Sequence, residues 1–264
     1  MARIYAIANQ KGGVGKTTTV VNLCAYLAGS GRRVLMVDLD PQANATSALG
    51  YDKSEMEPST YHLLLEQSPA SEVRLRHEEF KIDLLPSHPS LAGAEIELVH
   101  AIGREYRLQR ALQGLDAEYD YILIDSPPSL GLLTLNSLTA ARDGILIPVQ
   151  CEYLPLEGLS QLTKTIHLVQ EYLNPSLHIR GVMMTMYDSR TNLSRQVVEE
   201  VRRHFPNKVF RTIIPRNIRL SEAPSFGRPI NYYAPHSPGA VAYKLLTMEL
   251  LNGDRRNGGG EHAG

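Results

Sequence analysis

A glycine-rich stretch with two lysines and a run of threonines lies between residues 9 and 19, directly after a short apolar run. Glycines let the backbone curl so that several N–H groups point at one anion, and the helix expected next adds partial positive charge at its N-terminus. Lys16 is placed to reach the β- and γ-phosphates of a nucleotide, and the Thr17 hydroxyl suits Mg²⁺. The predicted phosphate-binding residues are Lys11, Gly12, Gly13, Val14, Gly15, Lys16, Thr17 and Thr18.

This loop departs from the usual P-loop pattern, which has a glycine five residues before Gly15. The chain has Gln10 at that position and carries Lys11 as a second lysine inside the loop. The sequence therefore predicts a P-loop of the deviant Walker A type that binds a nucleotide together with Mg²⁺.

Two further apolar runs end in aspartates. Residues 34–38 end in Asp38 and continue to Asp40, and residues 121–125 end in Asp125. An aspartate that closes a buried strand beside a P-loop can hold Mg²⁺, directly or through water, so Asp125 is a predicted metal ligand. Asp38 is predicted to serve Mg²⁺ or the structure of its loop, and Asp40 to reach a water at the γ-phosphate. An aspartate at such a position is also a common cap or turn residue.

Charge is unevenly distributed along the chain. The net charge is −1, but residues 1–179 carry an excess of seven acidic residues and residues 180–264 an excess of six basic ones. Residues 190–228 hold nine lysines and arginines against three glutamates, without a helix-turn-helix, zinc-finger or aromatic RNA-binding pattern. Because these patterns are absent, the sequence predicts that any nucleic-acid binding uses contacts with phosphates and does not read the base sequence. A solvated surface is the alternative interpretation.

The elements that would position these residues alternate along the chain. Strands are expected at residues 4–8, 34–38, 82–85, 121–125, 144–149, 179–186 and 209–213, and helices at 17–28, 91–99, 105–115, 132–141, 156–172, 193–204 and 240–251. Several strands are apolar at almost every position, which is typical of strands covered on both faces. The predicted fold class is α/β, a doubly wound, mostly parallel sheet with helices on both faces. Ligands of such sheets bind at the carboxyl ends of the strands.

Composition supports one globular domain. Hydrophobic residues make up 43% of the 264 residues and charged residues 21%, which excludes disordered, collagen-like and coiled-coil chains. Residues 1–251 are predicted to form a single domain, and the polar, glycine-rich residues 252–264 a disordered tail. There is no signal-peptide pattern and no apolar run of membrane-spanning length, and Cys24 and Cys151 are too few for a disulfide framework. These features predict a cytoplasmic protein without membrane contact.

Six blocks carry a resemblance to the ParA/Soj chromosome- and plasmid-partitioning ATPases. They are KGGVGKTT (11–18), VDLDPQANAT (37–46), ILIDSPPSLGLLTLNSL (122–138), PVQCEYLPLEGLSQL (148–162), MYDSRTNLSRQVVEEV (186–201) and IPRNIRLSEAPSFGRPI (214–230). The likeness runs from about residue 2 to residue 251. Ala43 is a departure, because the family usually has glycine there.

The resemblance implies an ATP-bound homodimer with the nucleotides sandwiched between the subunits. Lys11 would reach the phosphates of the partner's ATP, Asp40 would activate the attacking water, and Gly12 would face its twin across the interface. The catalytic residues implied are Lys11, Lys16 and Asp40, and the adenine would lie beside Pro215 and Asn217.

The family further implies non-specific binding of double-stranded DNA, through Arg190 and Arg219 and more weakly through Arg195 and Arg202. It also implies nucleoid association and a ParB-type centromere-binding partner that stimulates hydrolysis.

Three other classes share parts of this pattern. A MinD-like division-site ATPase needs a basic amphipathic C-terminal helix, whereas the tail here contains only Arg255 and Arg256 as basic residues. An iron–sulfur reductase needs a cysteine pair placed to ligate a cluster, which Cys24 and Cys151 do not provide. A DNA-binding nucleotide switch with little hydrolysis would differ from an ATPase in its release of phosphate.

Overall fold

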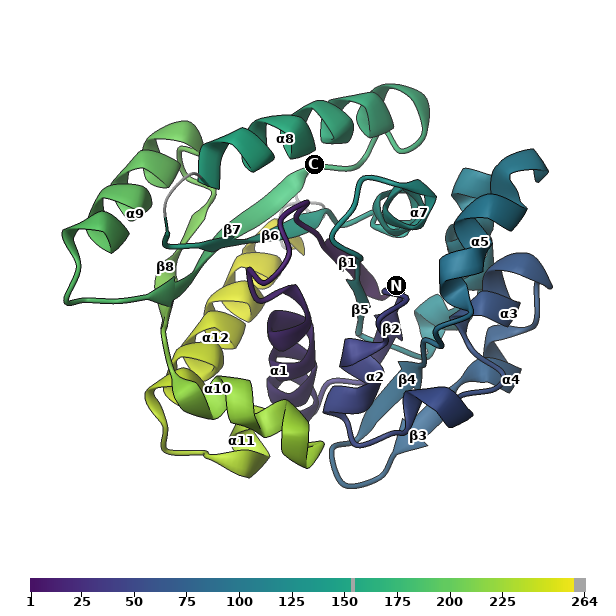
Figure 1. Ribbon diagram of the computed structural model, residues 1–264, viewed down its shortest axis with the longest axis horizontal. Helices are drawn as coiled ribbons and strands as arrows, with labels where there is room; N and C mark the ends of the chain where they lie inside the picture. Colours follow the sequence, from purple (N-terminus) through teal and green to yellow (C-terminus); the bar gives the residue numbers. More distant parts are fainter. Residues whose placement is uncertain (153–154, 259–264) are drawn as a thin grey trace.

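A computed structural model describes residues 1–152 and 155–258, and its core is an eight-stranded sheet (Figure 1). The strand order is β3-β4-β2-β5-β1-β6-β7-β8, and every neighbouring pair is parallel except β3 and β4. The strands are β1 (Arg3–Ile7), β2 (Val34–Asp38), β3 (Leu75–His77), β4 (Ile82–Leu85), β5 (Tyr121–Asp125), β6 (Ile145–Gln150), β7 (Ile179–Tyr187) and β8 (Val209–Pro215).

The parallel strands are buried because helices cover both faces of the sheet. In β1, Tyr5 and Ile7 pack into the core on the side of α1 and α12, whereas Ile4 and Ala6 face the opposite side. The α-helices are α1 (Lys16–Gly29), α2 (Asn44–Ala48), α3 (Thr60–Leu65), α4 (Ala70–Val73), α5 (Leu91–Glu97), α6 (Arg107–Ala111), α7 (Leu132–Ala140), α8 (Pro155–Tyr172), α9 (Asn192–His204), α10 (Ile218–Glu222), α11 (Ile230–Tyr233) and α12 (Pro238–Gly258). The predicted α/β fold class is confirmed.

The local structure differs from the prediction at α6 and at β3. The helix expected at residues 105–115 is the short α6 between two 3₁₀ turns, and Gly114 lies in the left-handed region at φ 90°, where the helix has ended. The short β3, at the edge of the sheet and antiparallel to β4, was not predicted because three residues are too few to show a period.

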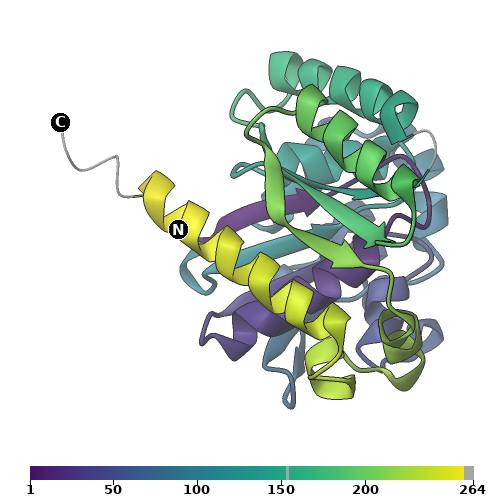
Figure 2. The same cartoon turned by 90° about the vertical axis from the view of Figure 1, so that its left-hand side faces the viewer.

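The disordered tail predicted from residue 252 is wrong for residues 252–258, which continue α12 (Figure 2). Residues 259–264, the rest of that prediction, lie outside the described residues. The reason is Asp254, whose side chain is buried although its neighbours in sequence are polar. Its carboxylate accepts hydrogen bonds from the hydroxyls of Tyr5 and Tyr121, at 2.8 and 2.9 Å, and from the guanidinium of Arg180.

Candidate nucleotide site

The glycine-rich loop lies between β1 and α1, at the carboxyl edge of the sheet. Gly13 and Gly15 adopt φ of 74° and 89°, a region that glycine enters without steric cost. Two neighbours fix the loop in place. The Asn9 side chain accepts from the N–H of Lys11 at 3.1 Å and donates to a carbonyl of β6, and the Thr185 hydroxyl on β7 donates to the carbonyl of Val14 at 2.9 Å.

The two lysines of the loop have opposite environments. Lys16 is 6% exposed, and its Nζ donates to the carbonyl of Lys11 at 3.2 Å. Burial lowers the pKa of Lys16, and the carboxylates of Asp125 and Asp40 oppose that shift. The residue Lys11 is exposed at the lip of the loop. One lysine therefore faces the loop's own interior, and the other faces outward.

Thr17 and Asp125 meet beneath the loop, as the sequence predicted for a metal site. The Thr17 hydroxyl donates to Oδ2 of Asp125 at 2.7 Å. The other oxygen of Asp125, Oδ1, and the hydroxyl of Ser126 are buried and find no hydrogen-bond partner among the described residues. Burial, with the nearby charge of Asp38 second, holds the pKa of Asp125 well above its usual range.

This arrangement fits Mg²⁺. Within the described residues no cluster of three or more His, Cys, Asp or Glu side chains forms a metal site. Mg²⁺ does not require one, because it is commonly held by one or two protein oxygens together with waters and substrate phosphates. An unpartnered carboxylate oxygen beside a threonine hydroxyl, next to a phosphate loop, is such a donor set.

Asp38 and Asp40 form a second acidic pair one strand away, on β2 and the loop after it. Both oxygens of Asp38 are engaged by this loop: Oδ1 accepts from the N–H of Asp40, and Oδ2 accepts from the N–H and hydroxyl of Thr46 at 2.8 and 2.7 Å. Burial raises the pKa of Asp38 to about 6, against these hydrogen bonds. The contacts of Asp38 therefore favour the loop-structure alternative, and its role in metal binding stays a prediction.

Asp40 is 6% exposed and lies on the same loop. Its Oδ1 accepts from the N–H of Gln42 at 2.9 Å, and the Ser87 hydroxyl donates to its carbonyl at 2.8 Å. The neighbouring Ala43 is fully buried with φ 50° and ψ 38°. A left-handed conformation costs a residue with a Cβ roughly 1–2 kcal/mol. The departure from glycine noted in the sequence therefore falls at a position of backbone strain, next to Asp40.

A cleft of about 520 Å³ opens beside the loop. It is lined by Gly15 and Thr18 from the loop side and by Pro215 and Asn217 from the end of β8. The Asn217 side chain accepts from the N–H of Arg219 and thereby caps the N-terminus of α10, which fixes this wall. The structure thus brings both predicted adenine-binding residues to one cleft with the phosphate loop.

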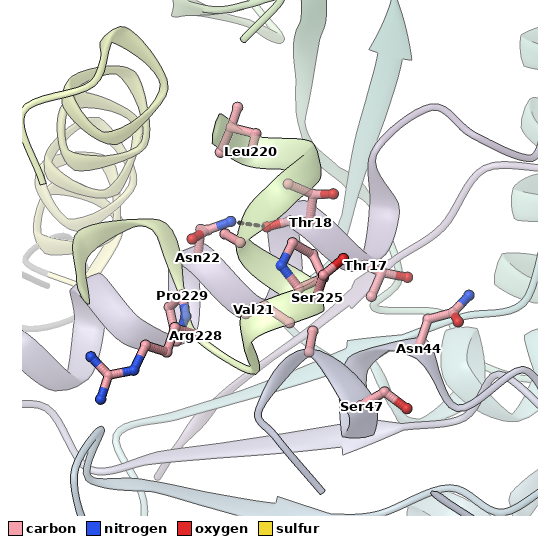
Figure 3. Close-up of a pocket in the computed structure, with 13 residues that line it drawn as sticks. Thr17, Thr18, Val21, Asn22, Asn44, Ser47, Leu220, Ser225, Arg228 and Pro229 are labelled. Carbon is pink, nitrogen blue, oxygen red and sulfur yellow. Dashed lines mark hydrogen bonds between the residues drawn. The ribbon is translucent and has the colours of Figure 1, made fainter. Parts of the chain in front are cut away.

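A second pocket, of about 380 Å³, adjoins this cleft and shares Thr18, Leu220 and Pro224 with it (Figure 3). Thr17 and Thr18 line it from α1, Asn44 and Ser47 from α2, and Ser225 from the segment after α10. Its walls therefore come both from the start of α1, directly after the phosphate loop, and from α2, the helix that follows Asp40.

Two of the predicted DNA-contacting arginines, Arg190 and Arg219, lie at the same carboxyl edge, after β7 and β8, whereas Arg195 and Arg202 lie along α9, which runs back from that edge. The loops after these strands are joined by a hydrogen bond from the N–H of Arg216 to the carbonyl of Tyr187. Arg190 lies in the first of these loops and forms an ion pair with Asp188 at 2.7 Å. Arg219 follows the second and pairs with Glu222 at 2.8 Å.

Arg195 and Arg202 are exposed on α9, with no ion pair to a described residue. The hydrogen bonds from Arg190 lower the pKa of Asp188 to about 2, so Asp188 stays ionised. A phosphate that approaches Arg190 or Arg219 therefore competes with a carboxylate, whereas Arg195 and Arg202 are free to meet one.

Sequence reasoning missed several residues that complete the nucleotide site. Asn9 and Thr185 hold the loop, and Ser126 places an open hydroxyl beside Asp125. Tyr243 of α12 lines the cleft of about 520 Å³, which is called the base cleft below because the predicted adenine-binding residues line it. Ser126 follows Asp125 directly and carried a usable signal. Thr185 and Tyr243 carried none, because their partners lie more than 150 residues away in sequence.

Comparison with known proteins decides the family. The family model described as "AAA domain" matches residues 2–179. The chain is 56% identical over 250 residues to the sporulation initiation inhibitor protein Soj of Bacillus subtilis, covering 95% of this chain and 98% of that protein. It is 54% identical over 254 residues to the chromosome partitioning protein ParA of Myxococcus xanthus, covering 96% and 89%. The chain belongs to the ParA/Soj family of partitioning ATPases.

Solved structures agree with a ParA/Soj fold. A structure named as cobyrinic acid a,c-diamide synthase of Mycobacterium smegmatis, with bound ADP and magnesium, matches with a TM-score of 0.86 and 42% identity over 97% of both chains. The cell division ATPase MinD of Pyrococcus furiosus matches with a TM-score of 0.77 and 25% identity, over 96% of this chain and 99% of that one. In the part of the chain that the structure describes, no helix is both long and apolar enough to cross a bilayer.

Proposed function

We propose that this partitioning ATPase closes into a dimer around two ATP molecules, that the dimer binds DNA without sequence preference, and that a ParB-type partner stimulates hydrolysis and release. The observation that carries the proposal is the contrast inside one loop. Lys16 is turned into the loop, whereas Lys11 and Gly12 are exposed at its lip.

ATP is the proposed substrate. Its triphosphate would lie on the N–H groups of residues 12–18 with Lys16 beside the β- and γ-phosphates, and its base would lie between Thr18 and the Pro215–Asn217 wall. Thr17 and Asp125 would hold Mg²⁺, which supplies charge neutralisation at the phosphates when it is bound. The relative from Mycobacterium smegmatis, solved with ADP and magnesium, supports both ligands.

The buried charges of Lys16 and Asp125 support a role in nucleotide binding over a purely structural role in the loop. Removing one charge from water is costly unless a partner compensates it. Lys16 has a carbonyl as its hydrogen-bond acceptor, and Asp125 keeps one open oxygen, so both gain compensation when phosphates and Mg²⁺ arrive.

Hydrolysis would need Asp40 and Lys11 in addition. Asp40 lies at the end of β2, on the loop beside the phosphate site, and would orient the attacking water. Lys11 would supply positive charge to the partner's transition state, where charge develops on the transferred phosphoryl group. Stimulation by DNA and by a ParB-type protein would act on this arrangement.

The surroundings of Gly12 support the proposal that a second subunit contacts the loop. Unlike Gly13 and Gly15, Gly12 does not have a positive φ, and a Cβ built on it would meet its nearest atom of this chain at 3.9 Å. A side chain therefore fits at Gly12 within a single subunit. In the proposed dimer the same position faces its twin, and a side chain there would hold the two loops apart.

DNA binding would use Arg190, Arg195, Arg202 and Arg219. With about three phosphate contacts per subunit, the salt slope is about −2.7 for one subunit and about −5.4 for two, at about −0.9 per contact. Only the dimer would bind appreciably near physiological salt, which would make DNA binding depend on ATP. Nucleoid association would follow from this dependence.

The deciding experiment compares three variants by size-exclusion chromatography with Mg-ATP, a DNA-shift assay and phosphate release. Asp40→Ala should give a long-lived dimer that binds DNA and releases little phosphate. Gly12→Val should bind ATP but remain monomeric and fail to shift DNA. Lys11→Ala should lose the hydrolysis that DNA and a cognate ParB-type protein stimulate.

Matched controls separate these effects from misfolding. Gly29→Val places the same side chain on an exposed glycine at the end of α1 and should dimerise normally. Arg190→Glu should dimerise but lose DNA, whereas Arg33→Glu, an exposed and paired arginine at the amino edge of the sheet, should retain it. A monomeric Asp40→Ala or a dimeric Gly12→Val would overturn the proposal, and wild-type phosphate release without ATP-dependent DNA binding would contradict it as well.

A further inference from the structure

A separate cavity of about 490 Å³ lies between α3, α4 and α6, on the flank of the molecule opposite to α9 and β8 (Figure 1). It shares no lining residue with the base cleft or with the pocket between α1 and α2. Its volume is in the range of pockets that hold small molecules. No step of the proposed ATPase cycle uses it.

Two arginines of α6 line this cavity. Arg107 and Arg110 are three residues apart, so they lie on neighbouring positions of one helix face. The Nε and Nη1 atoms of Arg107 are buried and have no hydrogen-bond acceptor among the described residues. Neither arginine forms an ion pair with a described side chain. A guanidinium whose buried donors lack acceptors destabilises the folded protein.

The rest of the cavity wall is partly apolar, and its described polar side chains add no free negative charge. Ser68 and Ser71 line it beside the start of α4, and the described part of the chain offers their side-chain hydroxyls no hydrogen-bond partner. Glu118 is the acidic lining residue, and its carboxylate is taken by an ion pair with Arg74 at 2.5 Å. The cavity therefore combines two unpaired guanidinium groups with two hydroxyls.

We infer that this cavity is a binding site for a small phosphorylated molecule. A guanidinium presents its donors in a fork that matches the oxygens of a phosphate, and hydroxyls supply the further donors that a dianion needs. The concave surface between three helices surrounds a small ligand on several sides, whereas a duplex would present its phosphates to a flatter surface. Binding there supplies acceptors for Arg107 that the described residues do not.

The site can be tested with the nucleotide site filled. The full chain is saturated with Mg²⁺ and a non-hydrolysable ATP analogue, which occupies the γ-phosphate position, and is titrated calorimetrically with inorganic phosphate and with glycerol 3-phosphate. Wild type should bind glycerol 3-phosphate. Arg107→Gln should weaken that binding at least tenfold, Arg110→Gln and the Ser68→Ala, Ser71→Ala double variant should weaken it by a smaller factor, and Arg32→Gln should leave it unchanged. Arg32 is a matched control because it is a half-buried arginine outside the cavity.

A second readout separates a ligand site from a purely structural arginine. Without ligand, Arg107→Met should melt at the same temperature as wild type or higher, because it removes buried donors that lack acceptors. With glycerol 3-phosphate, the melting temperature of wild type should rise and that of Arg107→Met should not. Equal affinity in wild type and Arg107→Gln would overturn the inference. So would binding of inorganic phosphate alone, or the absence of binding by either probe. None of these results depends on dimer formation or on DNA.

Discussion

The two ends of the parallel sheet both bury aspartates, but they treat them in opposite ways. At the amino ends of β1 and β5, the carboxylate of Asp254 receives four hydrogen bonds, from Tyr5, Tyr121 and twice from Arg180. At the carboxyl ends of the same strands, Asp125 receives one hydrogen bond from Thr17 and leaves its other oxygen without a described partner. The first arrangement is complete within the protein, and the second needs something from outside.

This difference indicates which buried charges serve stability and which serve ligand binding. A buried ion pair that is fully hydrogen-bonded fixes the position of the helix that carries it. A buried carboxylate with an open oxygen instead lowers the stability of the ligand-free protein. The cost is offset when Mg²⁺ and phosphates bind. Variants at each end should therefore separate stability from function.

The largest effect on stability is expected from Asp254→Ala. It leaves the half-buried Arg180 without its ion-pair partner and two tyrosine hydroxyls without an acceptor, which should cost about 3 kcal/mol of unfolding free energy. Urea unfolding measures the loss, and ATP affinity of the remaining folded protein should be unchanged. Unaltered stability would show that the cluster does not hold α12.

Asp125→Asn should show the reverse pattern. The amide oxygen still accepts from Thr17, so the free energy of unfolding without nucleotide should change by less than about 1 kcal/mol. The stabilisation that saturating Mg-ATP gives wild type, about 2.7 kcal/mol at a hundredfold excess over Kd, should be largely lost. Thermal melts with and without Mg-ATP provide the measurement, and retained Mg-ATP stabilisation would remove Asp125 from the metal site.

Ala43→Gly should stabilise the nucleotide end slightly. Glycine relieves a left-handed cost of roughly 1–2 kcal/mol but adds about 0.4–1 kcal/mol of unfolded-state entropy, so the net gain should be about 0.5–1 kcal/mol. Ala43→Val serves as the opposite control and should destabilise the protein, because a β-branched side chain resists positive φ. Chemical unfolding measures the free energy of unfolding of both variants. A lower value for Ala43→Gly than for wild type would contradict the conclusion that the backbone is strained at Ala43.

The smallest effect should appear at the exposed pair of Asp188 and Arg190. Arg190→Gln removes the hydrogen bonds that depress the Asp188 pKa, so this pKa should rise from about 2 toward its ordinary value. Carboxyl NMR titration reports the change directly. Since the pair is exposed, the melting temperature should stay the same, and a clear fall would contradict a purely surface role.

Local sequence patterns predicted the carboxyl edge of the sheet well. The strands ending at Asp38 and Asp125 were predicted at the observed bounds, because a run of buried residues followed by polar ones gives a sharp boundary. The phosphate loop was predictable because its glycines, lysines and threonines are consecutive. The family resemblance added Pro215 and Asn217, which the fold brings to the same cleft.

The amino edge was not predictable by these means. Asp254 stands in a polar, glycine-containing segment, and its partners Tyr5 and Tyr121 lie 249 and 133 residues away. Nothing in the local pattern distinguishes this aspartate from a solvated one. The cavity beside Arg107 was missed for a similar reason, because an arginine without a partner is a property of three-dimensional packing.

The Asp254 cluster also bears on how the protein is made. Chains emerge from the ribosome N-terminus first, and domains generally fold as units. Here the central strands β1 and β5 bury the hydroxyls of Tyr5 and Tyr121, whose acceptor lies 249 and 133 residues further along the chain. A nascent or truncated chain that ends before Asp254 therefore holds an unfinished core, with Arg180 also awaiting its counter-charge. The turns of α12 around Asp254 thus complete the core only after both strands have been made, and we expect chains cut before Asp254 to be more susceptible to proteolysis than chains that contain it.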